Sequence, residues 1–250
     1  MKEIEKTIHY CWFGGNKKNK LIKKCINSWK RYMPEYEIKE WNEENFDVNC
    51  NKYVKQAYEC KKYAFVTDYA RLKIIYENGG IYFDTDVEVL KNFSKLLQEK
   101  GYLGFENAKN VNTGIGFAAH KHNNILKKLM ETYDDIQFVD ENGEMDMTPC
   151  TIRNMEVLEI LGLRYSDEIQ EFGDFFVYPP KYFCGFDLDN SCYQIQEETM
   201  TVHHFNASWE TGYTRFVSII KRKVMTMLGK ENAEKIRKLK KNIEKKVKGN

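Results

Sequence analysis

The stretch from Asn78 to Asp86 constrains the fold most, because it joins a helix end, a strand and two carboxylates. Its two glycines follow a helical pattern, and glycine tolerates the left-handed conformation that ends helices. Its apolar residues, Ile81 to Phe83, then predict a short buried strand. Asp84 and Asp86 come next, and buried carboxylates need a cation or a hydrogen-bond donor. Oxygen ligands suit Mg²⁺ or Mn²⁺, so the stretch predicts a metal site, with a solvated turn as the alternative.

The composition is that of a soluble globular protein, with 42% apolar and 30% charged residues in 250. No run of 18 apolar residues exists to span a membrane. The charged start, Met1 to Lys6, lacks the apolar segment of a signal peptide, so we expect a cytoplasmic protein. Seven cysteines occur without any C-x-x-C pair, which argues against a zinc ribbon or a disulfide scaffold.

A strand, a helix and a second strand open the chain. The first strand is expected over 7–13, the helix over 21–33 and the second strand over 36–41, an order that favours a parallel sheet covered by helices. Further helices are expected over 51–61, 64–77, 123–133 and 148–161, and further strands over 102–105, 115–119, 175–178 and 201–205. We therefore predict one α/β domain over residues 1–212 and a helical tail over 213–250.

Asp68 and Arg71 lie three residues apart, and hence on one face of the helix that precedes the acidic pair. One interpretation is a surface ion pair of little energetic consequence. The other is a carboxylate held by a guanidinium, with both groups directed at the hydroxyls of a bound sugar. Apolar neighbours on both sides leave little of that face for solvent.

Three further positions have both a functional and a structural interpretation. Trp12, which precedes a glycine turn after the first strand, could stack on a base or pack in the core. His203 and His204 point to opposite faces of a strand, so only one could complete a metal site with Asp86; each could also be structural. A second acidic pair, Asp187 and Asp189, lies in a predicted turn and is not expected to bind metal.

Three groups of residues, taken in this order, resemble glycosyltransferase family 32. The opening group is Thr7-Ile8-His9-x-x-Trp12. The central group is Phe65-x-Thr67-Asp68-x-x-Arg71 followed by Gly79-Gly80-Ile81-Tyr82-x-Asp84-x-Asp86, and the closing group is His203-His204-x-x-x-Ser208-Trp209. The family includes capsular-polysaccharide enzymes and shares its core with the catalytic domains of large clostridial glucosylating toxins.

The resemblance implies a GT-A fold with a Rossmann-like mixed sheet, a nucleotide-sugar donor, Mn²⁺ or Mg²⁺, and retention of anomeric configuration. It implies a hexosyltransferase of class EC 2.4 that uses a UDP-linked hexose or N-acetylhexosamine. The implied catalytic residues are Asp68, Arg71, Asp84 and Asp86, and the implied metal ligands are Asp86, Asp84 and His204. The implied donor-binding residues are His9, Trp12, Thr67, Asp68, Arg71, Tyr82, Asp84, Asn112, His203, Ser208 and Trp209.

The acceptor is expected to be a saccharide or a lipid-linked saccharide in cell-surface polysaccharide synthesis. A toxin-like transferase acting on a protein is one alternative. A phosphatase of the haloacid-dehalogenase type and a non-catalytic nucleotide-binding module are others. The phosphatase motif belongs on the first strand of its fold, whereas this acidic pair lies more than eighty residues into the chain.

The C-terminal tail is strongly basic. Residues 219–250 contain 12 Lys/Arg and 3 Asp/Glu, which leaves 27 basic and 34 acidic residues in the remainder. An apolar stripe lies beside basic side chains: Ile219, Ile220, Val224, Met227 and Leu228 next to Lys221, Arg222 and Lys223. The tail could lie on the inner, anionic face of a membrane or pack on the domain with a solvated basic end. Because aromatic residues do not interleave the basic ones, nucleic-acid binding is not expected.

Overall fold

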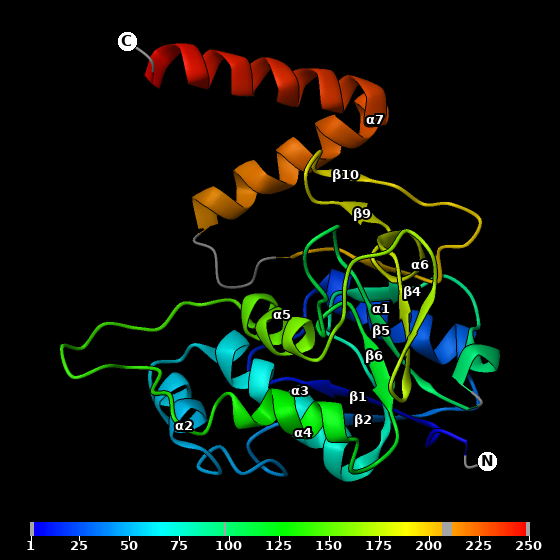
Figure 1. The fold of residues 1–250 in the computed structure, drawn as a ribbon, viewed down its shortest axis with the longest axis vertical. Coiled ribbons are helices and arrows are strands. Elements are labelled where there is room, and N and C mark those ends of the chain that lie inside the picture. Colours follow the sequence, from blue (N-terminus) through cyan, green and yellow to red (C-terminus); the bar gives the residue numbers. More distant parts are fainter. Residues whose placement is uncertain (1–2, 98, 207–211, 249–250) are drawn as a thin grey trace.

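A seven-stranded mixed sheet forms the centre of the protein in a computed structural model that describes residues 3–97, 99–206 and 212–248 (Figure 1). The strand order across the sheet is β2 (Glu37–Trp41), β1 (Thr7–Cys11), β3 (Gly80–Tyr82), β6 (Phe117–Ala119), β5 (Gly101–Gly104), β8 (Phe175–Tyr178) and β7 (Gln170–Phe172). β1 is parallel to β2 and β3, whereas β6 is antiparallel to β3 and β5. The predicted α/β class with a mixed sheet is confirmed.

Helices cover both faces of this sheet. They are α1 (Lys20–Tyr32), α2 (Lys52–Glu59), α3 (Tyr63–Asn78), α4 (Asn124–Glu131), α5 (Cys150–Ile160) and α6 (Pro180–Phe183), with a 3₁₀ helix over Ser94–Leu97. α2 to α5 enclose one hydrophobic core, and α1 and α6 enclose the other. Alternate residues of β1 serve the two cores, with Ile8 and Tyr10 in one and Cys11 in the other, as the period of a strand requires.

Local sequence explains the two helices that position the acidic pair. α1 buries Ile22, Cys25 and Trp29, and the Trp29 Nε1–H donates a 2.8 Å hydrogen bond to the carbonyl of Val87, just after the acidic pair. α3 ends at Asn78 because Gly79 takes φ 68°, a left-handed conformation that favours glycine. α5 begins at Cys150, two residues after the expected start at 148, and its N-cap residue, Pro149, makes no side-chain cap hydrogen bond.

Two small sheets flank the main one. β4 (Val87–Val89) pairs antiparallel with β11 (Thr201–His203), and β9 (Phe186–Asp187) pairs with β10 (Cys192–Tyr193). Of the second acidic pair, Asp187 ends β9 and Asp189 lies in the connection to β10, where the backbone N–H of Asn190 donates to Asp187, as expected of a turn.

The basic tail forms α7 (Gly212–Lys248), which bends at Gly229 and packs against β10 at one end of the molecule (Figure 1). Gly229 has φ 75° and ψ 165°, values that interrupt a helix. Within the described ranges, no helix is both long and apolar enough to cross a bilayer.

Candidate active site

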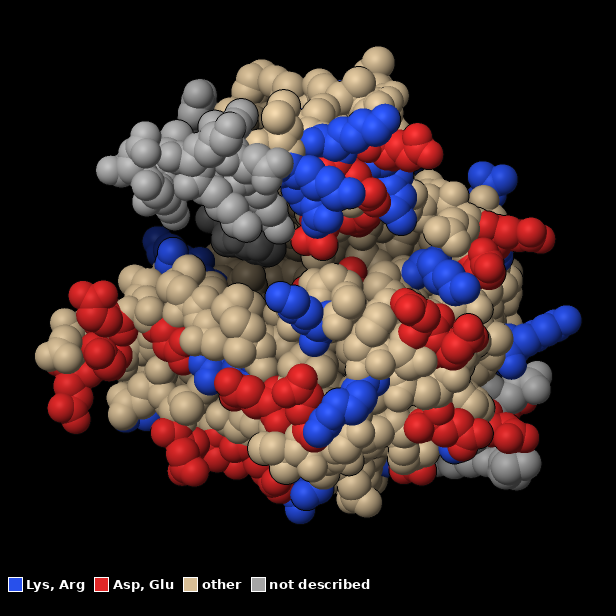
Figure 2. Space-filling model, turned by 45° about the horizontal axis from the view of Figure 1, so that its top comes forward, with Lys and Arg blue, Asp and Glu red and all other residues tan. Residues whose placement is uncertain are grey.

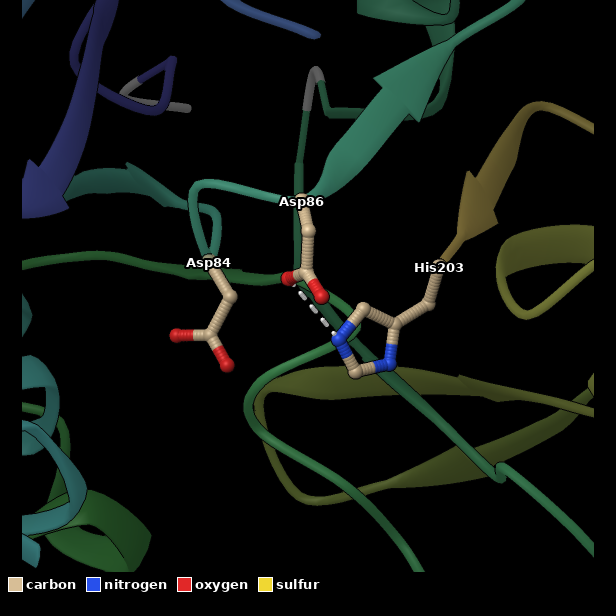
Figure 3. A group of neighbouring side chains, drawn as sticks. All are labelled: Asp84, Asp86 and His203. Atoms are coloured by element: carbon tan, nitrogen blue, oxygen red, sulfur yellow. Dashed lines mark hydrogen bonds and ion pairs between the residues drawn. The ribbon is translucent and has the colours of Figure 1, made fainter. Parts of the chain in front are cut away.

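The acidic pair occupies a tight turn between β3 and β4, where the Val87 N–H donates a 3.0 Å hydrogen bond to the Asp84 carbonyl. β4 pairs with β11, and this pairing sets His203 opposite Val87 and next to Asp86. Asp84, Asp86 and His203 each offer a ligand atom, and these atoms all lie within 4.8 Å of one another (Figure 3). Residues more than a hundred positions apart thus form one candidate metal site.

Two donors hold the Asp86 carboxylate. His203 Nε2 lies 3.1 Å from Asp86 Oδ1, and the backbone N–H of Asn206 donates to Oδ2 at 2.7 Å. Burial alone would raise the pKa of Asp86, but His203 and the Asn206 N–H outweigh it and hold that pKa well below its usual value. Burial likewise acts to lower the pKa of His203, and Asp86 reverses the effect and raises it. Asp86 is therefore ionised at neutral pH, and its carboxylate is held in a fixed orientation.

Asp84 is held by a different set of groups. Arg71 Nη2 lies 3.1 Å from Asp84 Oδ1, and the Tyr82 hydroxyl donates to the same oxygen at 2.9 Å. The Asp84 N–H also donates to the carbonyl of Gly114 at 3.2 Å. Burial raises the pKa of Asp84, whereas Arg71 opposes this shift. The two carboxylates of the pair therefore differ in environment and in basicity.

Arg71 links the acidic pair to α3. Its Nη2 lies 3.0 Å from Asp68 Oδ1 as well, so one nitrogen bridges the two carboxylates Asp68 and Asp84. The Arg71 and Asp68 side chains are only 5% and 14% exposed. The interpretation of Asp68 and Arg71 as a surface ion pair is therefore wrong, because apolar packing of α3 directs both groups inward at the site.

The loop before β6 closes the site from another side. Asn112 donates from Nδ2 to Glu106 Oε2 at 2.7 Å and accepts from the Gly114 N–H at 2.6 Å. A Cβ on Gly114 would lie 2.5 Å from Asp84 Oδ2 and 3.0 Å from Arg71 Nη1. The Asp84–Arg71 pair can therefore lie where it does only because Gly114 has no side chain.

His204, the histidine that the sequence analysis placed on the metal, points away from it. His204 Nε2 lies 2.9 Å from Glu88 Oε2, and its Nδ1 lies 2.7 Å from the Tyr193 hydroxyl. The expectation for His204 is thus corrected in favour of His203. Adjacent residues of an extended segment face opposite sides, and the register of β11 against β4 decides which one meets Asp86.

Comparison with known proteins bears on the central part of this site. Residues 19–103 match the family model of a glycosyltransferase sugar-binding region containing a DXD motif. The chain carries a DXD-type sugar-binding region. That region includes Asp68, Arg71, Asp84 and Asp86, whereas His203 lies beyond it.

Two solved structures are similar to this chain. One is the PaToxG glycosyltransferase, with a TM-score of 0.50 and 18% identity over 64% of this chain and 70% of that one. The other is a glycosyltransferase involved in the glycosylation of the major capsid of PBCV-1, with a TM-score of 0.44 and 13% identity over 87% of this chain and 98% of that one. No curated protein shows significant sequence similarity. The first likeness confirms the GT-A-type fold.

The remaining donor-binding candidates of the sequence analysis fall in three places. Trp12 follows β1 at the same edge of the sheet as the DXD turn, half-buried, with its Nε1–H donating to the Asn16 carbonyl at 2.7 Å. The Thr67 hydroxyl donates to the Tyr63 carbonyl at 2.9 Å on the first turns of α3. Ser208 and Trp209 lie outside the described residues.

His9 and Tyr82 were expected to touch the donor, but both are buried. The His9 ring is 2% exposed, and its Nδ1 accepts from Trp41 Nε1 at 3.0 Å within the core. The Tyr82 ring is fully buried, and its hydroxyl holds Asp84 instead. The direct donor contacts expected of both residues are therefore corrected: Tyr82 contacts the site through Asp84, and His9 packs in the core.

Burial of His9 should make the stability of the protein depend on pH. Burial, with Lys39 nearby, lowers the pKa of His9 from 6.5 to about 4. The unfolded chain therefore binds a proton as the pH falls through 6.5, while the folded chain stays neutral, and stability falls with the pH. We expect His9 to contribute a loss of about 2 kcal/mol between pH 7 and pH 5 in denaturant unfolding. His9→Asn, which keeps an acceptor for Trp41, should flatten this slope; an unchanged slope would refute the assignment.

Replacing Gly114 with alanine should disturb the site without unfolding the protein. The added methyl group displaces Asp84 or Arg71, and a misplacement of this size can lower kcat/KM for sugar transfer by about 100-fold. The measurement is steady-state kinetics together with a thermal melt. Gly143→Ala is the control for activity: nothing lies within 4 Å of that Cβ, so the strain of alanine at a φ of 83° lowers stability without displacing Asp84 or Arg71. Equal activity of the two variants would show that Gly114 is not needed to shape the site.

The two adjacent histidines provide a direct test of the metal site. His203→Gln should weaken Mn²⁺ binding by roughly 100-fold, since it removes a ligand and the partner of Asp86. His204→Gln is the matched control, and it should leave Mn²⁺ affinity within a few-fold of the unmodified protein. Isothermal titration calorimetry with the metal alone measures both. The opposite ranking would restore His204 as the ligand.

Several residues of the site were not predicted from the sequence. Gly114 follows Asn112-Thr113 and gave a weak turn signal only, and Glu106 gave no signal at all. The role of Asn206 has no signal in the sequence, because this residue contacts Asp86 through its backbone N–H rather than through its side chain. Phe205, which precedes Asn206, takes φ 44°, a conformation that is uncommon for a bulky residue.

Proposed function

We propose that this protein is a retaining, metal-dependent glycosyltransferase of family 32. It moves a hexose or N-acetylhexosamine from a nucleotide sugar, UDP-linked, to a saccharide or lipid-linked saccharide in cell-surface polysaccharide synthesis. The observation that carries this proposal is the convergence of Asp84, Asp86 and His203 at the DXD turn, beside the buried pair Asp68 and Arg71. The match of residues 19–103 to a DXD sugar-binding region supports it.

The donor set fits Mn²⁺ or Mg²⁺. Two carboxylates and one imidazole are close enough to share one ion, and mixed oxygen and nitrogen ligands favour Mn²⁺. Asp86 is ionised, because His203 and the Asn206 N–H lower its pKa. When bound, the ion supplies positive charge that neutralises the departing diphosphate. Asp84, Asp86 and His203 would hold it.

The groups around the ion site would position the sugar and the nucleotide. Arg71 fixes Asp84 and Asp68 relative to each other, so that the Asp68 carboxylate faces the site at a set distance from the acidic pair. The free lone pairs of Asp68 can accept hydrogen bonds from sugar hydroxyls. Trp12, at the same sheet edge, offers a ring face to the base.

Retention is proposed to proceed by same-face attack, in which a phosphate oxygen of the leaving group takes the acceptor's proton. Asp68 is the side chain placed to act as a nucleophile in the alternative, a double displacement. Its pairing with Arg71 at 3.0 Å makes the carboxylate less nucleophilic, and it holds the carboxylate in one orientation. A covalent sugar on Asp68, found by mass spectrometry after rapid quenching, would overturn same-face attack in favour of double displacement.

The decisive experiment is a donor screen. The purified protein is mixed with UDP- and GDP-sugars, with Mn²⁺, Mg²⁺ or EDTA, and nucleotide release is measured. We expect slow hydrolysis of one UDP-sugar without acceptor, dependent on metal and abolished by EDTA. If no nucleotide sugar binds or reacts while a simple phosphate ester is hydrolysed, the transferase is excluded and a phosphatase is favoured. Donor binding without any turnover would favour a non-catalytic module.

A further inference from the structure

The first part of α7 exposes apolar side chains along one side. Phe216 is 61% exposed and Met227 is 88% exposed. The residues called here the apolar face of α7 are Phe216, Val217, Ile220, Val224, Met227 and Leu228; Ile219, which is 38% exposed, lies outside this face, near the docked side of the helix. With 100° of rotation per residue, these positions fall within about one third of the helix circumference. They form a continuous stripe.

The opposite side of the same helix is fixed to the domain. Met225 is buried with Cys192 of β10, and the Tyr193 N–H donates to the Thr226 hydroxyl at 3.2 Å. Arg222 donates to the carbonyls of His204 and Phe205. Docking on the domain therefore uses Arg222, Met225 and Thr226, and it leaves the apolar face turned outward.

Basic side chains border the apolar face. The helical positions of Lys221 and Lys223 place one lysine on each side of the stripe, and both are exposed. From residue 213 to residue 230 the sequence contains five Lys/Arg and no Asp/Glu. At the end of the molecule that carries α7, Lys and Arg side chains lie beside uncharged surface, with some Asp and Glu side chains among them (Figure 2).

We propose that the apolar face of α7 binds the surface of an anionic lipid bilayer. Apolar side chains would enter the boundary between headgroups and acyl chains, and the lysines on both sides would reach the lipid phosphates. A second copy of the chain fits this face less well. Pairing two such helices would set lysines near lysines, with no carboxylate in this part of either helix to neutralise them.

A bound membrane would be connected directly to the candidate active site. Arg222 holds the carbonyls of His204 and Phe205, and the next residue, Asn206, donates its N–H to Asp86. The helix, the bilayer and the DXD turn would thus keep a fixed arrangement. The membrane proposal stands without the proposed function, since it depends on the surface of α7 alone.

Vesicle co-sedimentation of the full chain tests the proposal. Vesicles of phosphatidylcholine are compared with vesicles that also contain 30% phosphatidylglycerol. We expect binding to the anionic vesicles that weakens with salt, and little binding to the neutral ones. Ile220→Ser/Val224→Ser/Met227→Ser should lose at least tenfold in affinity. Lys221→Gln/Lys223→Gln should lose roughly 30-fold in affinity for these vesicles, because each basic residue at an anionic surface contributes about 1 kcal/mol.

The matched control is Lys235→Gln/Lys238→Gln, which removes the same charge from exposed positions beyond the bend at Gly229. It should retain most of the binding. Thermal melting and metal-dependent donor hydrolysis in solution should be unchanged in all three variants, which separates this test from that of the proposed function. Equal vesicle binding by the apolar variant would overturn the proposal. Two other results would overturn it too. One is a dimer that the apolar variant abolishes while no form of the protein binds vesicles. The other is salt-sensitive binding to duplex DNA in place of binding to vesicles.

Discussion

The Asp86→Asn variant is expected to lose sugar transfer by on the order of 1,000-fold, because the change removes the anionic ligand at the site where leaving-group charge is neutralised. The substitution keeps the shape of the side chain, and the amide oxygen can still accept from the Asn206 N–H. It removes the negative charge that His203 faces at 3.1 Å. The fold should therefore remain, while both metal affinity and turnover fall.

Two measurements separate the outcomes for Asp86→Asn. Nucleotide release is followed across a Mn²⁺ titration, and metal affinity is measured by calorimetry. Asp189→Asn is the matched control: it belongs to the other acidic pair, its side chain is 77% exposed, and its partner is Arg237. The control should behave like the unmodified protein. Normal turnover by Asp86→Asn would end the assignment of a metal-dependent transferase, although it would leave the fold unaffected.

The second large effect is expected from Arg71→Met, which should lower the free energy of unfolding by about 3 kcal/mol and abolish transfer. Arg71 is 4% exposed and pairs with Asp68 and Asp84 at 3.0 and 3.1 Å. Methionine keeps much of the volume but leaves two half-buried carboxylates that repel each other. Equilibrium unfolding in urea measures the loss.

Two further variants show whether the missing charge is the cause. Adding Asp68→Asn and Asp84→Asn to Arg71→Met should recover most of the stability, because no unpaired charge remains, without recovering activity. Arg31→Met, at an exposed arginine of α1, is the control and should cost less than about 0.5 kcal/mol. A loss in the triple variant as large as in Arg71→Met alone would mean that packing, rather than charge pairing, explains the effect.

Local sequence determined most of the helices, the central strands and the position of the acidic pair, whereas the short elements β4, β7, β9, β10 and α6 were not predicted. The helix end at Gly79, the buried strand after it and the carboxylates at 84 and 86 follow from the conformational freedom of glycine, the clustering of apolar residues and the cost of burying charge. The helical spacing of Asp68 and Arg71 placed them on one face, and the order of elements indicated an α/β sheet. All of these depend on neighbours a few residues apart.

Only the tertiary structure decided which distant residues join the acidic pair. The register of β11 against β4 selects His203 over His204, and the approach of the loop before β6 requires Gly114 to lack a side chain. Packing likewise buried His9 and Tyr82 and turned the apolar face of α7 outward. Periodicity assigns a side chain to one of two faces of an element. What packs against that face depends on contacts with segments far away in the sequence, and local sequence patterns do not predict these contacts.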